Sequence, residues 1–458
     1  MMTAWLAELA WIGDRLLPRV LLEEEGGRLR RVEELGHAQI PEGAKVLSGL
    51  TLPGLVNVHS HAFHRALRGR CQAPGQSGKD FWGWRRWMYA LASFLEPDQY
   101  FELSRATMGE MTLAGITAVG EFHYLHHQPG GQPYRRPEME EALVAAAEEA
   151  GLRLTLLDTC YLRSGFDGSP LGSAALRFTD GEADAWARRV DRLAESSRVR
   201  RGAAIHSVRA VDQDAMRVVA EWAFERRAPL HLHLSEQLEE NAACLQATGL
   251  TPTELVDSCG ALGAQTTAVH AIHLTRSDIA RLGETGTRIC VCPTTERDLG
   301  DGVCPADELQ AAGSPICLGS DSNALVDLFE EARAIELDRR LVTGHRGWLS
   351  SEDLLKASTS QGAAALGWDA GELRTGCLAD FTTLELSSPR LAGAGLADLL
   401  PRVVFGASAA DVRSVIVGGE EVVRDGRHLR LGSVAEKLES VLEALEPAWS
   451  EALAGMSS

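Results

Sequence analysis

The sequence predicts an α/β protein built on a closed (β/α)8 barrel, with a small β-sandwich domain formed from both ends of the chain. The middle of the chain alternates short apolar runs with helical patterns, and eight such runs can be counted. Repeated β-then-α units favour parallel strands, and eight of them favour closure into a TIM-type barrel. At 458 residues the chain is long enough for such a barrel and a smaller domain.

Both ends of the chain have a different character from the middle. Near the N-terminus, strand-like runs are separated by turns, and Gly26-Gly27 between two such runs favours a hairpin. The tail returns to this pattern in ADFTTLEL and in VRSVIVGGEEVVRDGRHL, which has a second Gly-Gly turn at Gly418. We therefore expect three parts: a β domain from residues 1–54 plus 377–432, a barrel from 55–376, and a C-terminal helix at 433–458.

The barrel strands are predicted from short apolar runs that are followed by helical or loop sequence. The stretch PEMEEALVAAAEEAG, for example, has apolar residues at helical spacing after the second run. In chain order the eight predicted strands are LVNVHSH, GITAVGEFHYL, LRLTLLDTCYL, RRGAAIHSV, PLHLHLSE, QTTAVHAIHL, TRICVCPTTE and PICLGSD.

Composition excludes several classes of partner. A formal net charge of −19 argues against nucleic acid or an anionic membrane surface, although a local arginine pair can still hold a small anion. No apolar segment approaches the roughly 20 residues of a membrane helix, and the N-terminus lacks the basic region of a signal peptide. Nine cysteines without framework spacing indicate reduced thiols, so we expect a cytoplasmic protein. Cys290 and Cys292, within an apolar strand, are expected to be core residues.

The first barrel strand ends in His59 and His61, which share one face because strand side chains alternate. Neutral imidazole is a good ligand for zinc and related metals. Singly, residues of this kind are often core histidines, capping acids or solvated charges. Their recurrence at strand ends, where core packing favours aliphatic side chains, indicates an active site at the carboxyl-terminal rim. The further candidates are Glu121, His123, Tyr124, His206, Arg209, His231, His233, Glu236, His270, His273 and Asp321.

The segments His59-Ser60-His61 and His233-Leu234-Ser235-Glu236, with His270 and Asp321, resemble the amidohydrolase superfamily, specifically its mononuclear-metal deaminase branch. The narrower motifs resemble the formimidoylglutamate deiminases (N-formimino-L-glutamate iminohydrolases) of histidine degradation. These motifs are PGLVNVHSHAFHRALRG, DFWGWRRWMY, EFHYLHH, HSVRAV, HLHLSEQ, CPTTE and LGDG. The resemblance implies metal-dependent hydrolysis of N-formimidoyl-L-glutamate to N-formyl-L-glutamate and ammonia.

The resemblance also assigns a role to each site residue. Glu236 and His270 become proton-transfer residues, and Asp321 both binds the metal and accepts a proton. The metal ligands are His59, His61, His233 and Asp321, and the substrate contacts are His64, Arg85, Tyr124, His206 and Arg209. Arg86, next to Arg85, is an alternative substrate contact.

One divalent metal ion per subunit is expected, with zinc favoured over iron or manganese, and the resemblance also implies a homodimer. Three nitrogens and one carboxylate leave a position open for water. The ion lowers the pKa of that water from about 15.7 to roughly 7, so that hydroxide can attack the substrate. The substrate itself is expected to be a small anionic formimino amino acid.

Two positions depart from the family pattern, and several alternatives stay open. His64 stands where the family has Gln, and Arg297-Asp298 replaces a small residue and Asn. The substrate could instead be formimino-aspartate, or a purine, pyrimidine or triazine acted on by a related deaminase or chlorohydrolase. A catalytically inert scaffold would have lost metal ligands. We expect the remaining histidines to support the site residues from behind or to be structural: His123, His126, His127, His231 and His273.

Overall fold

The barrel closes on itself through the residues that follow its first and last strands. The computed structural model describes residues 3–72 and 81–455, so Asp80 of the DFWGWRRWMY motif lies outside them. After the last strand, Asp321 N donates to His59 O and His61 N donates to Asp321 O, both at 2.9 Å. The eight parallel strands follow one another in chain order, which confirms the predicted barrel. They are β5 (Leu55–Ser60), β6 (Ile116–His123), β7 (Arg153–Cys160), β8 (Val199–Ile205), β9 (Leu230–Leu234), β10 (Thr266–His270), β11 (Arg288–Val291) and β12 (Ile316–Leu318).

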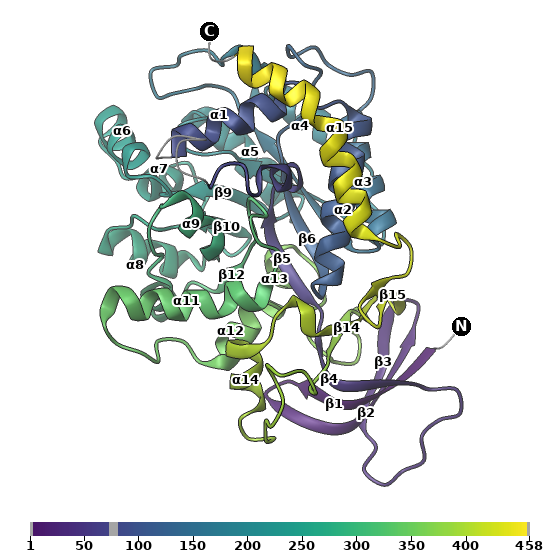
Figure 1. Cartoon of the computed structure of the whole chain (residues 1–458). Coiled ribbons are helices and arrows are strands. Elements are labelled where there is room, and N and C mark those ends of the chain that lie inside the picture. Colours follow the sequence, from purple (N-terminus) through teal and green to yellow (C-terminus); the bar gives the residue numbers. More distant parts are fainter. Residues whose placement is uncertain (1–2, 73–80, 456–458) are drawn as a thin grey trace.

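Helices cover the outside of the barrel (Figure 1). Several of them begin and end at residues that are typical helix caps. Thr275 accepts from Asp278 N in a capping box at the start of one helix, and Gly286 ends that helix with φ 66°. The helices other than the C-terminal one are α1 (Phe81–Ala92), α2 (Pro97–Leu113), α3 (Glu138–Ala150), α4 (Ala183–Val190), α5 (Gln213–Glu225), α6 (Leu238–Thr248), α7 (Pro252–Ser258), α8 (Arg276–Thr285), α9 (Pro293–Leu299), α10 (Ala306–Ala312), α11 (Leu328–Thr343), α12 (Ser351–Ala357), α13 (Ser360–Ala365) and α14 (Leu399–Gly406). Three short 3-10 turns are η1 (Ala62–Leu67), η2 (Ser173–Phe178) and η3 (Ala409–Asp411).

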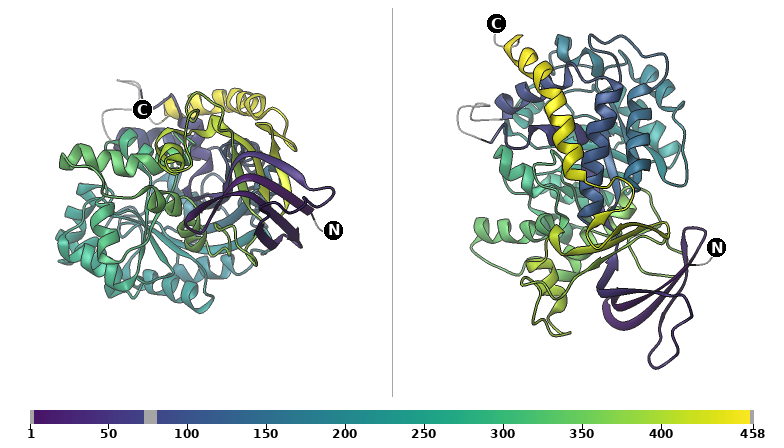
Figure 2. Two further views of the ribbon diagram at one scale, coloured as in Figure 1. Left: turned by 90° about the horizontal axis from the view of Figure 1, so that it is seen from below. Right: turned by 45° about the vertical axis from the view of Figure 1, so that its right-hand side comes forward.

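A second sheet joins the two ends of the chain, as Figures 1 and 2 show beneath the barrel. Its strands are β1 (Thr3–Ile12), β2 (Arg15–Glu25), β3 (Arg28–Glu34), β4 (Lys45–Pro53), β13 (Phe381–Leu384), β14 (Val412–Val417), β15 (Glu420–Arg424) and β16 (Arg427–His428). Strands β4 and β13 pair antiparallel and connect the two halves. Trp5 and Phe381 then pack edge to face with ring centroids 5.2 Å apart. The predicted small β domain from both termini is therefore confirmed.

Both Gly-Gly turns form hairpins as predicted. Gly26 and Gly27 have φ values of 64° and 83°, and Gly418 and Gly419 have 59° and 78°. Two successive residues with positive φ are typical of the tight turns that match the twist of paired strands, and glycine adopts them without steric cost. The boundaries proposed above between the three parts of the chain stay a prediction.

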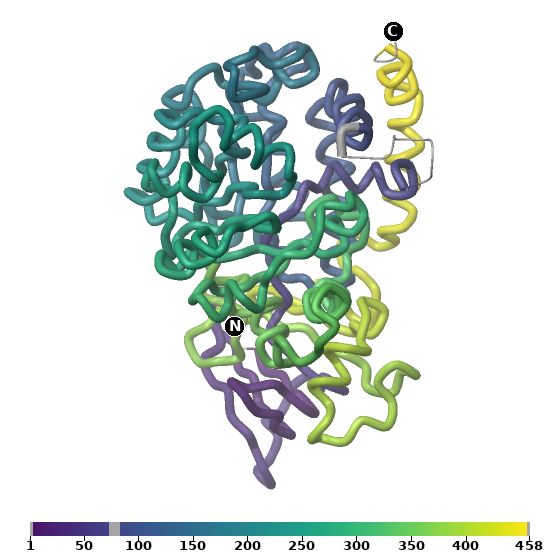
Figure 3. Tube along the Cα trace, turned by 90° about the vertical axis from the view of Figure 1, so that its left-hand side faces the viewer, coloured from purple at the N-terminus to yellow at the C-terminus, as the bar shows by residue number. Residues whose placement is uncertain are grey.

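The chain ends in a long helix, α15 (Val434–Gly455), which packs against α2 and α1. Figure 3 shows it running along one side of the barrel. Trp449 is buried, and its ring lies 5.9 Å from that of Trp87 on α1. Among the described residues, no helix combines the length and apolarity needed to cross a bilayer.

One buried ion pair ties the barrel to the second sheet. Arg153, at the start of β7, donates through Nε and Nη2 to Asp380, at 2.6 and 3.0 Å. The two side chains are 3% and 0% exposed. Asp380 also accepts from Gly418 N at 2.6 Å, so the carboxylate holds the hairpin turn as well.

Replacing Asp380 with Asn should destabilise the protein, because it leaves the Arg153 guanidinium buried without its counter-charge. Breaking a buried pair in this way costs about 3–5 kcal/mol. We expect a clear fall in the thermal unfolding midpoint, measured by circular dichroism. The double variant Arg153→Met/Asp380→Asn should recover part of the loss. An unchanged midpoint for Asp380→Asn would show that this pair does not hold the two parts together.

Candidate active site

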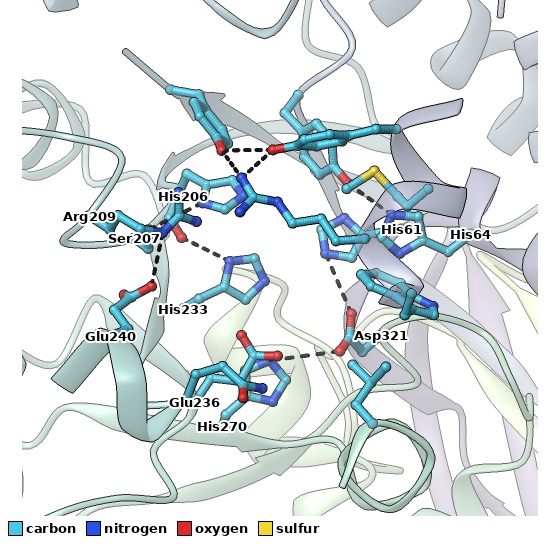
Figure 4. Close-up of a pocket in the computed structure, with 18 of the residues that line it drawn as sticks. His61, His64, His206, Ser207, Arg209, His233, Glu236, Glu240, His270 and Asp321 are labelled. Carbon is cyan, nitrogen blue, oxygen red and sulfur yellow. Dashed lines mark hydrogen bonds and ion pairs between the residues drawn. The ribbon is translucent and has the colours of Figure 1, made fainter. Parts of the chain in front are cut away.

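The predicted metal ligands come together at the carboxyl-terminal rim of the barrel, as Figure 4 shows for His61, His233 and Asp321. His59 lies on β5 and His61 follows it, His233 lies on β9, and Asp321 follows β12. The Nε2 atoms of His59 and His233 are 3.2 Å apart. Asp321 Oδ1 lies 3.5 Å from Nε2 of both His59 and His61. The ligand atoms of the three histidines thus lie within 4.8 Å of one another, and the carboxylate oxygen of Asp321 lies beside two of them.

The hydrogen bonds of His61 and His233 leave one nitrogen lone pair of each ring directed toward the other ligand atoms of this cluster. His61 Nδ1 donates to Phe122 O at 2.9 Å, and His233 Nδ1 donates to His206 O at 2.8 Å. Because a carbonyl only accepts, each neutral ring must present an unprotonated Nε2. Burial lowers the pKa of His59, His61 and His233 well below the ordinary value, so the rings are neutral.

Such a cluster of acceptors fits a divalent cation. Unprotonated imidazole nitrogens and an acidic oxygen cannot satisfy one another by hydrogen bonding, and the carboxylate supplies a negative charge. Metal-binding histidines commonly donate their other nitrogen to a backbone carbonyl, which fixes the ring. The donor set of three nitrogens and one oxygen suits zinc and its neighbours. The residues present are therefore chemically suited to hold the metal that the sequence predicts.

A polar network behind the cluster holds the loop after β12 in an unusual conformation. Asp321 and Asn323 have positive φ values of 45° and 54°, which non-glycine residues seldom adopt. Asn57 Nδ2 donates to Ser320 Oγ, and Ser320 Oγ donates to Asn323 Oδ1, both at 2.7 Å. Asn323 Nδ2 in turn donates to His61 O at 3.0 Å. This network was not predicted from the sequence, because Asn57 lies far along the chain from Ser320 and Asn323.

The two predicted proton-transfer residues face Asp321. His270 Nε2 lies 3.7 Å from Asp321 Oδ2 and 3.8 Å from Glu236 Oε1. His270 Nδ1 contacts Glu296 Oε1 at 3.2 Å. Burial alone would lower the pKa of His270, but the carboxylates of Glu236, Glu296 and Asp321 outweigh it and raise the pKa to about 10. Burial raises the pKa of Glu236 to about 7, so this carboxyl can carry a proton near neutral pH.

Glu296 is a residue that the sequence analysis left without a role. It lies in the CPTTE motif on α9, is 3% exposed, and also accepts from Cys292 N at 2.9 Å. Its contact with Nδ1 directs the other nitrogen of His270 toward Glu236 and Asp321. The clue available in the sequence was the acid of CPTTE itself, which follows the seventh predicted barrel strand. Cys292 and Cys290 are both fully buried free thiols, as predicted.

Beside the cluster lies a cavity of about 280 Å³ with two arginines in its wall. Arg85 donates from Nη2 to Tyr161 OH at 3.1 Å and also to Tyr89 OH. Arg209 Nε contacts Glu240 at 3.3 Å, and its Nη1 donates to Ser164 O at 3.0 Å. Tyr161 and Glu240 were not predicted, and both hold these guanidinium groups in place.

The other predicted substrate contacts also line this cavity. His64 is 3% exposed, and its Nε2 lies 2.8 Å from Tyr124 OH. Burial lowers the pKa of His64 to about 3, so the ring is neutral. The ring of His206 lies 4.2 Å from that of Tyr161. Arg86 is exposed and does not line the cavity, which favours Arg85 for the substrate contact.

The second departure from the family pattern points away from the site. Arg297 pairs with Asp338 at 2.8 Å and with Glu330 at 3.0 Å, and Asp298 accepts from Gln72 at 2.8 Å. Neither Arg297 nor Asp298 lines the cavity. Arg297 and Asp298 therefore change ion pairs and hydrogen bonds outside the cavity, whereas His64 changes the cavity wall itself.

The remaining histidines do not line the cavity. His126 Nδ1 contacts Glu140 Oε1 at 3.0 Å, and His123 Nε2 contacts the same oxygen at 3.2 Å. His231 Nε2 donates to Ala365 O at 3.3 Å. The ligand atoms of His123, His126 and Glu140 lie within 4.8 Å of one another. The supporting or structural role expected of these histidines, and of His127 and His273, stays a prediction.

Comparison with known proteins shows which family the chain belongs to. The model of the amidohydrolase family matches residues 50–422. A formimidoylglutamate deiminase from Pseudomonas aeruginosa is 36% identical over 398 residues, which are 84% of this chain and 87% of that protein. An 8-oxoguanine deaminase from the same organism is 32% identical over 418 residues, covering 88% and 89% of the two chains.

Solved structures agree with the sequence comparisons. The crystal structure of an amidohydrolase from Brucella melitensis has a TM-score of 0.88 at 31% identity and covers 97% of this chain and 99% of its own. A zinc complex of atrazine chlorohydrolase from Arthrobacter aurescens TC1 shares the fold, with a TM-score of 0.84 at 21% identity and coverage of 97% and 99%. The chain belongs to the amidohydrolase family and is a hydrolase of carbon–nitrogen bonds other than peptide bonds.

Proposed function

We propose that the protein removes ammonia from N-formimidoyl-L-glutamate and releases N-formyl-L-glutamate. The observation that carries this proposal is the pair Arg85 and Arg209, which share the cavity wall with Tyr161 above the cluster of His59, His61, His233 and Asp321. Arginine binds carboxylates through parallel hydrogen bonds, and this substrate has two carboxylates. The 36% identity to a formimidoylglutamate deiminase supports the same substrate.

A second candidate is a deaminase of a heterocyclic base. Aromatic side chains occupy much of the cavity wall and offer surfaces on which a flat ring could stack. They are Trp84, Tyr89, Tyr124, Tyr161 and Phe178. Relatives at 32% and 29% identity are an 8-oxoguanine deaminase and a 5-methylthioadenosine/S-adenosylhomocysteine deaminase. A neutral ring would bring no anionic group to Arg85 and Arg209, which is why we prefer the dicarboxylate.

The reaction adds water to the formimidoyl carbon and breaks its bond to the terminal nitrogen. We assign the metal site to His59, His61, His233 and Asp321, with zinc as the proposed ion. When bound, a divalent ion supplies an acidified water and a positive charge that polarises the substrate. Asp321 accepts the proton from the attacking water, and His270, 3.7 Å away, holds that carboxylate oxygen in position.

Glu236 completes the reaction by protonating the departing nitrogen. Its carboxyl borders the cavity and can carry a proton, since burial raises its pKa to about 7. Glu236 gives its proton to the imino nitrogen as the hydroxyl group adds to the carbon. The carbon–nitrogen bond then breaks while the proton that Asp321 took from the water passes to the same nitrogen, so that ammonia leaves. The hydroxyl oxygen of the adduct returns its proton to Glu236 as the carbon–oxygen double bond of the formyl group forms, which restores both carboxyl groups. Arg85 and Arg209 hold the carboxylates meanwhile, so that the formimidoyl group points toward the metal site.

Replacing Glu236 with Gln should lower kcat by about 10²–10⁴, because the amide has no proton to transfer. The metal content should stay at the wild-type level, since Glu236 is not an assigned ligand. Wild-type turnover should also fall as the pH rises through the pKa of Glu236, and this descending limb should be absent in the variant. Steady-state kinetics across pH and metal analysis check both points. Loss of the metal would instead make Glu236 a ligand.

Replacing Arg209 with Met should reduce kcat/KM for N-formimidoyl-L-glutamate at least tenfold, because a charge-assisted hydrogen bond contributes about 1.5–3 kcal/mol. The amide analogue of the substrate should be poor for the wild type and lose little more in the variant. Ammonia release is the readout, with N-formimidoyl-L-aspartate, 8-oxoguanine and 5-methylthioadenosine assayed in parallel. Preference for a purine would overturn the proposed substrate. Preference for the aspartate compound would keep the chemistry and change the name of the substrate.

A cytoplasmic location, a homodimer and a small anionic substrate as the main partner are part of the same proposal. The cavity of about 280 Å³ suits an acyclic amino acid derivative. His64, which replaces the Gln of the family pattern, places a neutral ring beside Tyr124 in the cavity wall. It is the residue that we expect to adjust the length of acceptable substrates.

A further inference from the structure

A second hollow, of about 700 Å³, lies on the far side of one wall of the active-site cavity. Tyr124 and Phe178 face the active site, whereas His126, His127 and Asp180 face the hollow. The two segments that form this wall are bonded to each other. The backbone N–H groups of His126 and His127 both donate to Arg177 O, at 3.2 and 3.1 Å.

The hollow gathers arginines on a chain whose net charge is −19. Five arginines line it, from the loop before α3 and from α4 and the residues after it. They are Arg135, Arg136, Arg188, Arg189 and Arg192. Asp180 is the only carboxylate in the lining. It is already engaged, because Arg189 Nη2 contacts it at 2.9 Å and His127 Nε2 at 3.2 Å.

The arginines of the hollow differ in how well they are paired. Arg189 is saturated by Glu140, Asp158 and Asp180. Arg136 and Arg188 each pair with one acid outside the lining, Glu141 at 3.3 Å and Glu182 at 3.0 Å. These two pairs are largely exposed and therefore weak, so a ligand can replace them.

Arg135 and Arg192 complete the set. Both are exposed, and within the described residues neither guanidinium group has a hydrogen-bond or ion-pair partner. The hollow thus has two unpaired cations and two weakly paired ones around a single neutralised carboxylate. Such an excess of positive charge in a concave site favours an anion, and arginine offers planar, paired donors for carboxylate or phosphate oxygens.

We propose that this hollow is a second binding site, specific for a small molecule that has at least two anionic groups. The acidic remainder of the surface repels extended polyanions, whereas a small anion can enter the hollow. The proposal does not depend on the substrate of the active site. Carboxylates and phosphates share the chemistry required, so the test uses one probe of each kind.

The test is calorimetric titration of the metal-loaded protein with tricarballylate and, separately, with fructose 1,6-bisphosphate. We expect Arg135→Gln/Arg192→Gln to weaken binding of at least one probe about tenfold or more, since charge-assisted bonds are lost. Its kcat for the proposed substrate should be unchanged, because neither residue borders the catalytic cavity. The probe that binds more tightly identifies the anionic group preferred.

Two control variants distinguish probe binding in the hollow from binding elsewhere on the protein. Arg276→Gln/Arg346→Gln removes the same charge from two exposed arginines outside the hollow, and it should bind the probes like the wild type. Arg209→Met disables the anion contact of the active site and should leave binding in the hollow intact. Wild-type affinity in Arg135→Gln/Arg192→Gln would overturn the proposal. An equal loss in Arg276→Gln/Arg346→Gln would also overturn it, since bulk charge would then explain the binding.

Discussion

The closure of the barrel and the construction of the active site depend on the same backbone pairing. Asp321 exchanges two backbone hydrogen bonds with His59 and His61, both at 2.9 Å. This pairing joins the ends of the first and last strands, and it also brings a carboxylate from one end of the barrel sequence to imidazoles from the other. The positive φ of Asp321, 45°, is maintained by this closure and by Asn323. A change that loosened the closure would therefore also disperse the candidate ligands.

Burial and charge then divide the histidines of the site into two classes. His59, His61 and His233 are held neutral, because desolvation lowers their pKa and outweighs the opposing effect of Asp321 on His61 and His233. His270 is surrounded by carboxylates, which raise its pKa despite burial. Neutral rings can bind a cation, whereas a protonated ring can hold a carboxylate, so one residue type serves two purposes within a few ångströms.

Much of this arrangement could be predicted from the sequence, because each barrel strand is a short apolar run and several of these runs end in histidine or an acidic residue. The eight apolar runs, both Gly-Gly turns and the histidines and acids at the strand ends were predicted. Of the latter, the structure places His61, His206, His233, Glu236, His270 and Asp321 in the wall of one cavity. The supporting residues could not be predicted. Asn57 contacts Ser320 across 263 residues of sequence, and Ser320 in turn contacts Asn323. A single sequence gives no sign of the first of these contacts.

The same limit applies to the cavity wall. Tyr161 follows the third barrel strand and resembles an ordinary core aromatic, yet its hydroxyl contacts Arg85. Glu240 lies on α6, where an acid in the first turn is expected from the helix dipole alone, and its contact with Arg209 is visible only in three dimensions. Local rules explain why each residue suits its element. They do not show which side chains from different elements meet.

The most direct test of this account is the metal content of the wild type and of Asp321→Asn, measured on purified protein by elemental analysis together with ammonia release. The account predicts one divalent ion per chain in the wild type. In the variant it predicts substoichiometric metal and activity lower by orders of magnitude, with the circular dichroism of a folded barrel retained. Stoichiometric metal with near-normal turnover in Asp321→Asn would contradict the assignment of this cluster as the catalytic metal site.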